Sequence, residues 1–434
     1  MLGAMTSIRE LAERHWEGEG DLVHEHHPVQ PVNQRGAEEL DDGVLYVKSI
    51  ASVSALDTGD GLVMLDTGGW FDVDHVYDSV RVWRARDPLA AAVYSHHHVD
   101  HVFGTKRFEE EATTEGWEQP VVYAHEEMPE HFDRYVKTNG WNSAINTRQF
   151  GFGLTRLEFP SEFRYPDVTY RDTVTFERGD LTFELRHARG ETDDATWTWV
   201  PERKILHPGD LFIWAVPNAG NPQKVQRYLS DWAAALRDMA ALEPEVMLAG
   251  HGLPIFGRDR IVSALVDTAE LLDSIEDQTL ALMNEGKSLD EVLHGVEVPA
   301  HLTEKPYLRP VYDHPQFLVR NVWRRYGGWY DGEPDNLLPA PRAQQAREWV
   351  GLAGGVGAVL DRVRELVAEG DLRVACHLLE FAVLAEPGSR EAHEVRAEVY
   401  RARSAQQESS MARNILGHAA LSSEQGLRDH AGQY

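Results

Sequence analysis

The stretch Ser95-His96-His97-His98-Val99-Asp100-His101 decides the fold of this chain. It follows an apolar run at residues 90–94 that predicts a β-strand, and a helical pattern over 73–85 precedes that strand. Polar chemistry at the C-terminal end of such a strand is typical of α/β proteins. Imidazole and carboxylate are preferred zinc ligands in hydrolytic sites, so the spacing His-x-His-x-Asp-His predicts a metal centre.

Three shorter motifs lie outward from this stretch, each after a predicted strand (62–65, 204–207 and 245–248). They are Asp66-Thr67-Gly68, Gly209-Asp210 and Gly250-His251-Gly252. Taken singly, Asp66 is explained as a turn former, Asp210 as a helix N-cap and His251 as a loop residue. All three motifs follow predicted strands, as the histidine stretch does, and this shared placement favours metal binding instead.

The remaining pattern divides the chain into a mixed part and a helical part. Further strands are predicted at 44–50, 52–56, 121–124, 168–176, 181–187 and 196–200, and helices at 225–242, 260–287 and 289–296. Residues 1–40 are polar, with an amphipathic piece near 8–16. A turn-rich junction occupies 327–334, and residues 355–405 predict paired helices with breaks near Gly370 and Pro387.

The ordered motif set resembles that of the metallo-β-lactamase superfamily. Gly190-Glu191-Thr192, with Glu where that superfamily usually has His, resembles the alkylsulfatase branch, as do Tyr123-Ala124-His125-Glu126 and the junction at 327–337. The resemblance implies an αββα sandwich followed by an all-α dimerisation domain. The expected division is an N-terminal extension (1–42), the hydrolase domain (43–265), a helical connection (266–334), the dimerisation domain (335–420) and a polar tail (421–434).

The resemblance also implies a dinuclear zinc centre, with Mn²⁺ or Fe²⁺ as alternatives because Glu191 is a harder donor than His. His96, His98 and Glu191 would hold the first ion, Asp100, His101 and His251 the second, and Asp210 would bridge them. Asp100 and Asp210 are the expected catalytic carboxylates, and Asp66 supports the site. A metal-bound hydroxide would then attack an alkyl or aryl-alkyl sulfate ester.

Two departures from the branch leave the substrate open. The Leu-Arg-Gly-Ala-Lys stretch, whose Arg helps to hold sulfate in the branch, is replaced by residues 217–224, and the bridging residue is Asp210 where the branch uses Glu. We expect the remaining anion-binding side chains to be Asn146, Arg148, Asn218, Asn221 and Lys224. Trp141, Trp214 and Tyr330 are candidates to line an apolar pocket, although core packing explains such residues more often.

Composition limits the partners. The 434 residues contain 42 Lys and Arg and 71 Asp and Glu, so the formal net charge is 42 − 71 = −29. This balance disfavours nucleic acid and anionic membranes, and the expected partners are a small anionic ester and a second copy of the chain. The single cysteine, Cys376, lies in an apolar helical pattern and is predicted to be a core residue. The sequence shows no signal-peptide pattern or membrane span, which predicts a cytoplasmic protein. The branch's further lipid-carrier-like domain is not expected, because the residues after the helical pattern are too few to form it.

Three functions remain open from the sequence. The first is a dinuclear zinc hydrolase of sulfate esters. The second is a metal hydrolase of the same fold that acts on a lactone, thioester or phosphoester. The third is a non-catalytic dimeric scaffold, which the intact ligand set disfavours.

Overall fold

The computed structural model describes residues 7–30, 35–151 and 153–433. Contacts divide the chain into two compact units. The first comprises residues 1–137, 160–287 and 291–326, and the second comprises 138–159, 288–290 and 327–434. The segment 138–159 thus belongs with the C-terminal helices although it interrupts the first unit in sequence. This division differs from the consecutive domains expected from the sequence, because 138–159 packs with the distant segment 327–434.

Two mixed β-sheets form the centre of the first unit. In one sheet the strands follow chain order: β1 (Gly36–Asp41), β2 (Val44–Lys48), β3 (Val53–Asp57), β4 (Leu62–Leu65), β5 (Leu89–Val93), β6 (Val121–His125) and β7 (Val168–Tyr170). The pairs β1 to β4 are antiparallel, whereas β4, β5, β6 and β7 are parallel. Parallel pairing brings the C-terminal ends of β4, β5 and β6 to one edge.

The second sheet has the order β13-β12-β11-β10-β9-β8. Its strands are β8 (Thr173–Arg178), β9 (Leu181–His187), β10 (Thr196–Val200), β11 (Ile205–His207), β12 (Val246–Met247) and β13 (Ile255–Phe256). The β11–β12 pair is parallel and the others are antiparallel. Residues 168–176, predicted as one strand, therefore form parts of two strands in different sheets, and the prediction of one strand was wrong.

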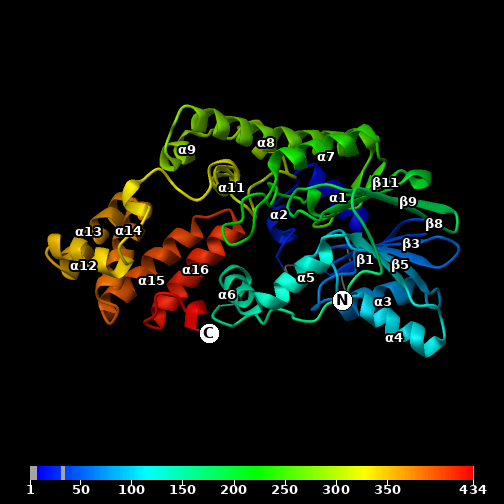
Figure 1. Cartoon of the computed structure of the whole chain (residues 1–434), viewed down its shortest axis with the longest axis horizontal. Helices are drawn as coiled ribbons and strands as arrows, with labels where there is room; N and C mark the ends of the chain where they lie inside the picture. Colours follow the sequence, from blue (N-terminus) through cyan, green and yellow to red (C-terminus); the bar gives the residue numbers. More distant parts are fainter. Residues whose placement is uncertain (1–6, 31–34, 152, 434) are drawn as a thin grey trace. The chain divides into compact units, whose positions relative to one another are not determined.

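Helices complete the first unit. They are α1 (Ile8–Trp16), α2 (Leu22–Glu25), α3 (Val73–Trp83), α4 (Thr105–Glu115), α5 (Met128–Lys137), α7 (Leu229–Ala241), α8 (Arg258–Asn284), α10 (Ala300–Thr303) and α11 (Pro315–Gly327), with α9 (Leu289–Gly295) at a unit boundary. Val76 and Val80 of α3 are fully buried against residues of β2 to β4. Helices α7 and α8 run side by side (Figure 1). Helix α8 continues through the expected domain boundary at 265–266 without a break.

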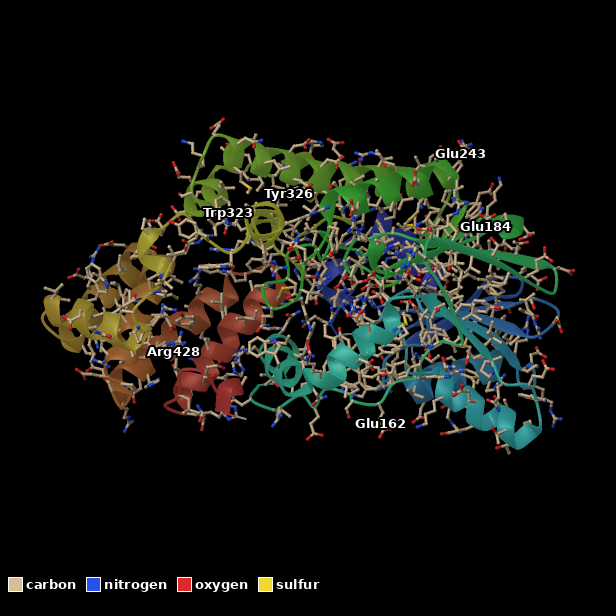
Figure 2. All side chains as sticks on the ribbon, in the orientation of Figure 1. Glu162, Glu184, Glu243, Trp323, Tyr326 and Arg428 are labelled. Atoms are coloured by element: carbon tan, nitrogen blue, oxygen red, sulfur yellow. The ribbon has the colours of Figure 1, made fainter. Side chains whose placement is uncertain are left out.

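The second unit is helical. It contains α6 (Asn139–Phe150), α12 (Arg342–Leu352), α13 (Val356–Glu369), α14 (Leu372–Ala385), α15 (Arg390–Ala405) and α16 (Ser410–Glu424). Cys376 lies in its core with Leu360 and Leu379, as predicted. Arg428, labelled in Figure 2, donates to Glu380 and ties the last residues to α14. The polar tail thus packs on its own unit.

The mixed sheets followed by a helical part confirm the predicted fold class. The N-terminal extension contributes more than coil, since β1 forms the edge of the first sheet. Among the described residues, none of the helices combines the length and hydropathy needed to cross a bilayer. The cytoplasmic location stays a prediction.

Candidate metal centre

Four loops at strand ends bring the predicted ligands together in the first unit. His96, His98, Asp100 and His101 follow β5, Glu191 follows β9, Asp210 follows β11, and His251 follows β12. Backbone bonds hold these loops to one another. The Thr196 amide donates to the Ser95 carbonyl, and the Gly250 amide donates to the Gly209 carbonyl.

The first group of donors lies around His96 and His98. His96 Nε2 and His98 Nδ1 are 2.8 Å apart. His96 Nε2 is 3.6 Å from Asp210 Oδ2, and His98 Nδ1 is 3.6 Å from Glu191 Oε1. Burial lowers the pKa of His96 to about 4 and holds the pKa of His98 well below its usual value, which favours the uncharged imidazole that a metal ion binds.

The second group shares Asp210 with the first. His101 Nε2 lies 3.4 Å from Asp210 Oδ1, and His251 Nε2 lies 3.3 Å from Asp210 Oδ2 and 3.5 Å from Asp100 Oδ2. The Nδ1 atom of His251 is 2.5 Å from the Ile50 carbonyl oxygen, to which it donates, so Nε2 is left to bind a metal. Asp210 therefore faces both groups, as a bridging carboxylate must.

Asp66 supports this arrangement through hydrogen bonds to the histidine stretch. Its carboxylate accepts from the Ser95 amide at 2.7 Å and from His101 Nδ1 at 2.7 Å, which directs His101 Nε2 toward Asp210. Asp66 is fully buried and has a φ of 56°, a conformation that side chains other than glycine seldom adopt. Burial alone would lower the pKa of His101, but Asp210, Asp66 and Asp100 raise it well above its usual value.

The donor atoms suit two divalent ions. His101 Nε2, Asp210 Oδ1 and Glu191 Oε2 are buried without a hydrogen-bond partner. Buried polar atoms seldom lack a partner, and two imidazole nitrogens as close as those of His96 and His98 are typical of ligands to one ion. The residues that can share an ion include the sets His96, His98, Asp210 and Asp100, His101, His251.

Gly250 allows the last histidine loop to approach Asp210. A Cβ atom at Gly250 would lie 2.6 Å from the Gly209 carbonyl oxygen and 2.7 Å from Asp210 Oδ1. Neither contact can be relieved by a flexible side chain, since one atom is backbone and the other is a candidate ligand. The Gly-His-Gly pattern thus has a steric reason.

Arg227 is a functional candidate that the sequence interpretation missed. It is 1% exposed, and its Nη1 forms an ion pair with Glu191 Oε1 at 2.7 Å, while Asn218 Nδ2 donates a hydrogen bond to the same oxygen. Burial raises the pKa of Glu191 to about 7, and Arg227 opposes that rise. Oε1 is engaged by these partners, which leaves Oε2 for a metal. The sequence did contain a signal for it. Arg227 follows Lys224 by three positions and so lies just after the stretch 217–224, from which the branch's Arg is absent.

Asp313, also missed, fixes the loop at 217–224. Its carboxylate accepts from the amides of Gly220 and Asn221 at 2.7 and 3.2 Å. The Asn221 side chain accepts from the Gln223 amide, which is a loop-forming bond. In this loop burial lowers the pKa of Lys224 to about 8, while Asp100 and Glu191 act to raise it. Of the loop residues predicted to bind substrate, Lys224 is thus electrostatically coupled to the metal ligands.

Asn146 and Arg148 lie on α6 in the second unit. Asn146 donates to the Asn142 carbonyl within the helix, and Arg148 forms an ion pair with Asp429 at 2.7 Å. Their roles as substrate-binding residues stay predictions.

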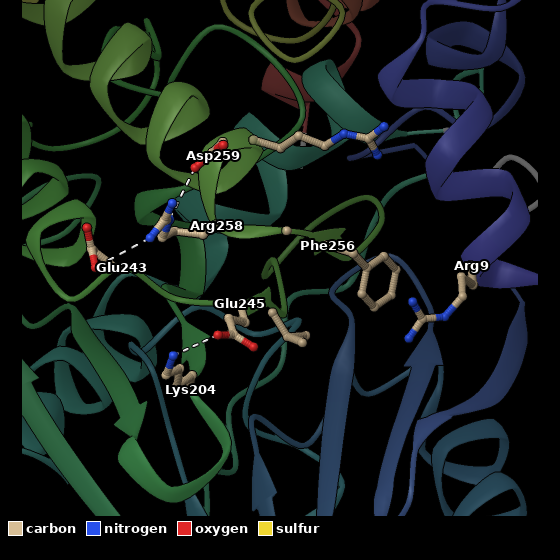
Figure 3. Close-up of a pocket in the computed structure, with 10 residues that line it drawn as sticks. Arg9, Lys204, Glu243, Glu245, Phe256, Arg258 and Asp259 are labelled. Carbon is tan, nitrogen blue, oxygen red and sulfur yellow. Dashed lines mark hydrogen bonds and ion pairs between the residues drawn. The ribbon is translucent and has the colours of Figure 1, made fainter.

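The aromatic candidates are divided between the two units. Trp214 is fully buried, donates to the Leu253 carbonyl and stacks on His15, so it is a core residue. Trp141 is 60% exposed in the second unit. A surface pocket of about 620 Å³ does exist elsewhere, between Arg9 and Asp259 (Figure 3). Two of its cations are paired with carboxylates of the same pocket, Lys204 with Glu245 at 2.7 Å and Arg258 with Asp259 at 3.1 Å.

Comparison with known families agrees with the two parts of the chain. Residues 48–251 match the metallo-beta-lactamase superfamily, and residues 288–426 match the alkyl sulfatase dimerisation family. The resemblance inferred from the motifs is thereby confirmed.

Named relatives are alkylsulfatases. A linear primary-alkylsulfatase from a Pseudomonas strain is 28% identical over 80% of this chain and 69% of its own length. An (R)-specific secondary-alkylsulfatase from Pseudomonas is 26% identical over 92% of this chain and 64% of its own length. The solved structure of a stereoselective inverting sec-alkylsulfatase from Pseudomonas has the same fold, with a TM-score of 0.82 over 91% of this chain and 66% of that one, at 24% identity. This chain therefore spans about two thirds of the length of these relatives.

Proposed function

The chain combines a metallo-β-lactamase domain with an alkylsulfatase dimerisation domain, and on this basis we propose that it is a dinuclear zinc hydrolase of alkyl or aryl-alkyl sulfate esters. The observation that carries the proposal is the shared carboxylate of Asp210. It lies between two groups of histidines, 3.6 Å from His96 Nε2 and 3.4 Å from His101 Nε2, and Asp210 Oδ1 and His101 Nε2 are buried without a hydrogen-bond partner. Mn²⁺ and Fe²⁺ are the alternative ions.

The residues around the two groups of donors would orient the ligands of the bound ions. Bound divalent ions supply Lewis acidity and lower the pKa of coordinated water. Asp66 fixes the tautomer and direction of His101, while the Ile50 carbonyl does the same for His251. Asn218 and Arg227 hold Glu191 from its Oε1 side.

Positive charge near the ligands supports an anionic substrate. Lys224 and Arg227 are coupled to each other and to Glu191, and His98 also experiences both charges. We assign the sulfate group to this neighbourhood, where Lys224 and Arg227 would take the place of the absent Arg. Ammonium and guanidinium donors bind such oxyanions strongly in a buried setting.

The experiment is to measure sulfate release from octyl sulfate by the zinc-loaded protein and by an Asp210→Asn variant. The wild type should turn over and contain close to two zinc equivalents in these two groups. The variant should lose turnover by at least about 1000-fold, because both ions lose a shared carboxylate. Equal turnover of the two proteins would overturn the proposal.

A lactone, thioester or phosphoester substrate is the second candidate function. The observation that favours it is the loop at 217–224, which lacks the branch's Arg.

A further inference from the structure

A second cluster of metal-binding side chains lies beside the first group in the same unit. His131 lies on α5, Glu127 precedes that helix, and Asp193 follows Glu191 by two positions. One donor atom from each of the three lies within 4.8 Å of the others. The rings of His131 and His97 are 4.5 Å apart, so the cluster adjoins the histidine stretch.

Two donor atoms of this cluster have no partner outside it. His131 Nε2 and Asp193 Oδ1 form an ion pair at 2.8 Å, and both atoms are buried without another hydrogen-bond partner. His131 is 6% exposed. Two donors about 2.1 Å from one tetrahedral ion lie about 3.4 Å apart, so the spacing of 2.8 Å is about 0.6 Å shorter than a bound ion would set. His101 Nε2 and Asp210 Oδ1 show the same combination in the main site.

His97 already has a partner at each ring nitrogen. Its Nδ1 lies 2.8 Å from Asp194 Oδ1, and its Nε2 accepts from Arg134 at 3.1 Å. The neighbourhood thus contains the carboxylates of Glu127, Asp193 and Asp194 against the guanidinium of Arg134. The excess of carboxylate over cation suits a divalent ion.

We propose that Glu127, His131 and Asp193 form a third metal site, which takes a zinc-type divalent cation. One imidazole and two carboxylates are a ligand set that zinc accepts. The exposure of Glu127 leaves one side open to water, so the ion exchanges with solvent. The bound ion connects α5 to the loop that carries Glu191. The proposal is independent of the substrate of the main site.

The test is the zinc content of the full chain after equilibration with buffered free zinc. The wild type should bind three equivalents, and a Glu127→Gln/Asp193→Asn double variant should bind two. Glu130→Gln is the matched control, since Glu130 is exposed on the same helix outside the cluster, and it should keep three. A wild type with one equivalent and a double variant with none would support this site while contradicting the dinuclear centre.

The single Glu127→Gln variant provides a second test in which no buried side chain is changed, because Glu127 is exposed. In a competition titration with a chromogenic chelator, this variant should bind one of its zinc ions about tenfold or more weakly than the wild type does. Zinc content and affinity equal to those of the wild type in both variants would overturn the proposal.

Discussion

At the scale of single residues, the contact between Arg227 and Glu191 carries much of the electrostatic argument. Both side chains are buried, and a buried charge that loses its partner costs about 3–5 kcal/mol. Glu191 is at once a candidate ligand and the anionic partner of Arg227. A substitution of Arg227 should therefore change the metal affinity of the first group of donors.

Arg227→Gln should weaken zinc binding at that group by about 10- to 100-fold, because Glu191 loses the cation that opposes its protonation. A zinc competition titration measures the effect. Arg237→Gln is the control, since Arg237 forms only a partly exposed pair with Asp273 on the surface. Unchanged affinity in Arg227→Gln would contradict the assigned role.

The sequence could predict which side chains gather at the candidate metal centre, but not the residues that hold those side chains in place. The ligands sit in short motifs with fixed spacing, such as His96 to His101, whereas Arg227 and Asp313 act over long separations in the chain. Asp313 reaches Gly220 from 93 positions away, and no local pattern encodes that contact.

At the scale of elements, strand ends and their loops position the site. Strands 62–65, 181–187 and 196–200 were predicted with their observed bounds, because each is an apolar or alternating run between turn residues. The division of 168–176 between two sheets was not predicted. A sequence pattern shows that residues are extended, but it does not show which sheet each one joins.

Gly250→Ala tests the close approach of two of these loops. The added methyl group would press on the Gly209 carbonyl and on Asp210, so we expect loss of at least one zinc equivalent and about 100-fold lower turnover. Metal analysis and kinetics measure both. Gly357→Ala, where a Cβ meets nothing within 4 Å, should leave zinc content unchanged. The same zinc content and turnover in both variants would show that the loops tolerate a side chain here.

Asp429 gives a pH-dependent prediction for the second unit. Hydrogen bonds from His418 and Arg148 hold the pKa of Asp429 well below its usual value near 3.8. A carboxylate with a lowered pKa in the folded state stabilises above its unfolded pKa, and that contribution is lost as pH falls further. Asp429→Asn should therefore lower thermal stability at pH 7, by about 0.5–1 kcal/mol given the partial exposure, and have a shrinking effect below about pH 4. A stability difference that does not shrink on acidification would contradict this.

At the scale of the whole molecule, the match to a dimerisation family predicts a homodimer. Helix α12 buries Ala346 and Val350 but leaves Trp349 60% and Leu352 82% exposed, so we place these two in the dimer contact. Trp349→Glu/Leu352→Glu should give a monomer in light scattering at micromolar concentration. Val82→Glu is the control, since Val82 is 88% exposed on α3. A dimer that persists in the double variant would place the interface elsewhere.

The acidic charge of the whole chain bears on substrate capture. An anionic ester must approach a protein with a formal charge of −29, so a local positive field is needed. Bound metal ions together with Lys224 and Arg227 would provide it. Sequence composition alone could not indicate this local reversal, because it depends on which charges the fold brings together.

The most direct test of the central claim is a substrate panel for the zinc-loaded full chain, comprising octyl sulfate, a lactone, a thioester and a phosphodiester. We predict release of sulfate from octyl sulfate, with slow or absent turnover of the others, and loss of that release after chelation. Hydrolysis of the lactone, thioester or phosphodiester without release of sulfate would contradict the assignment.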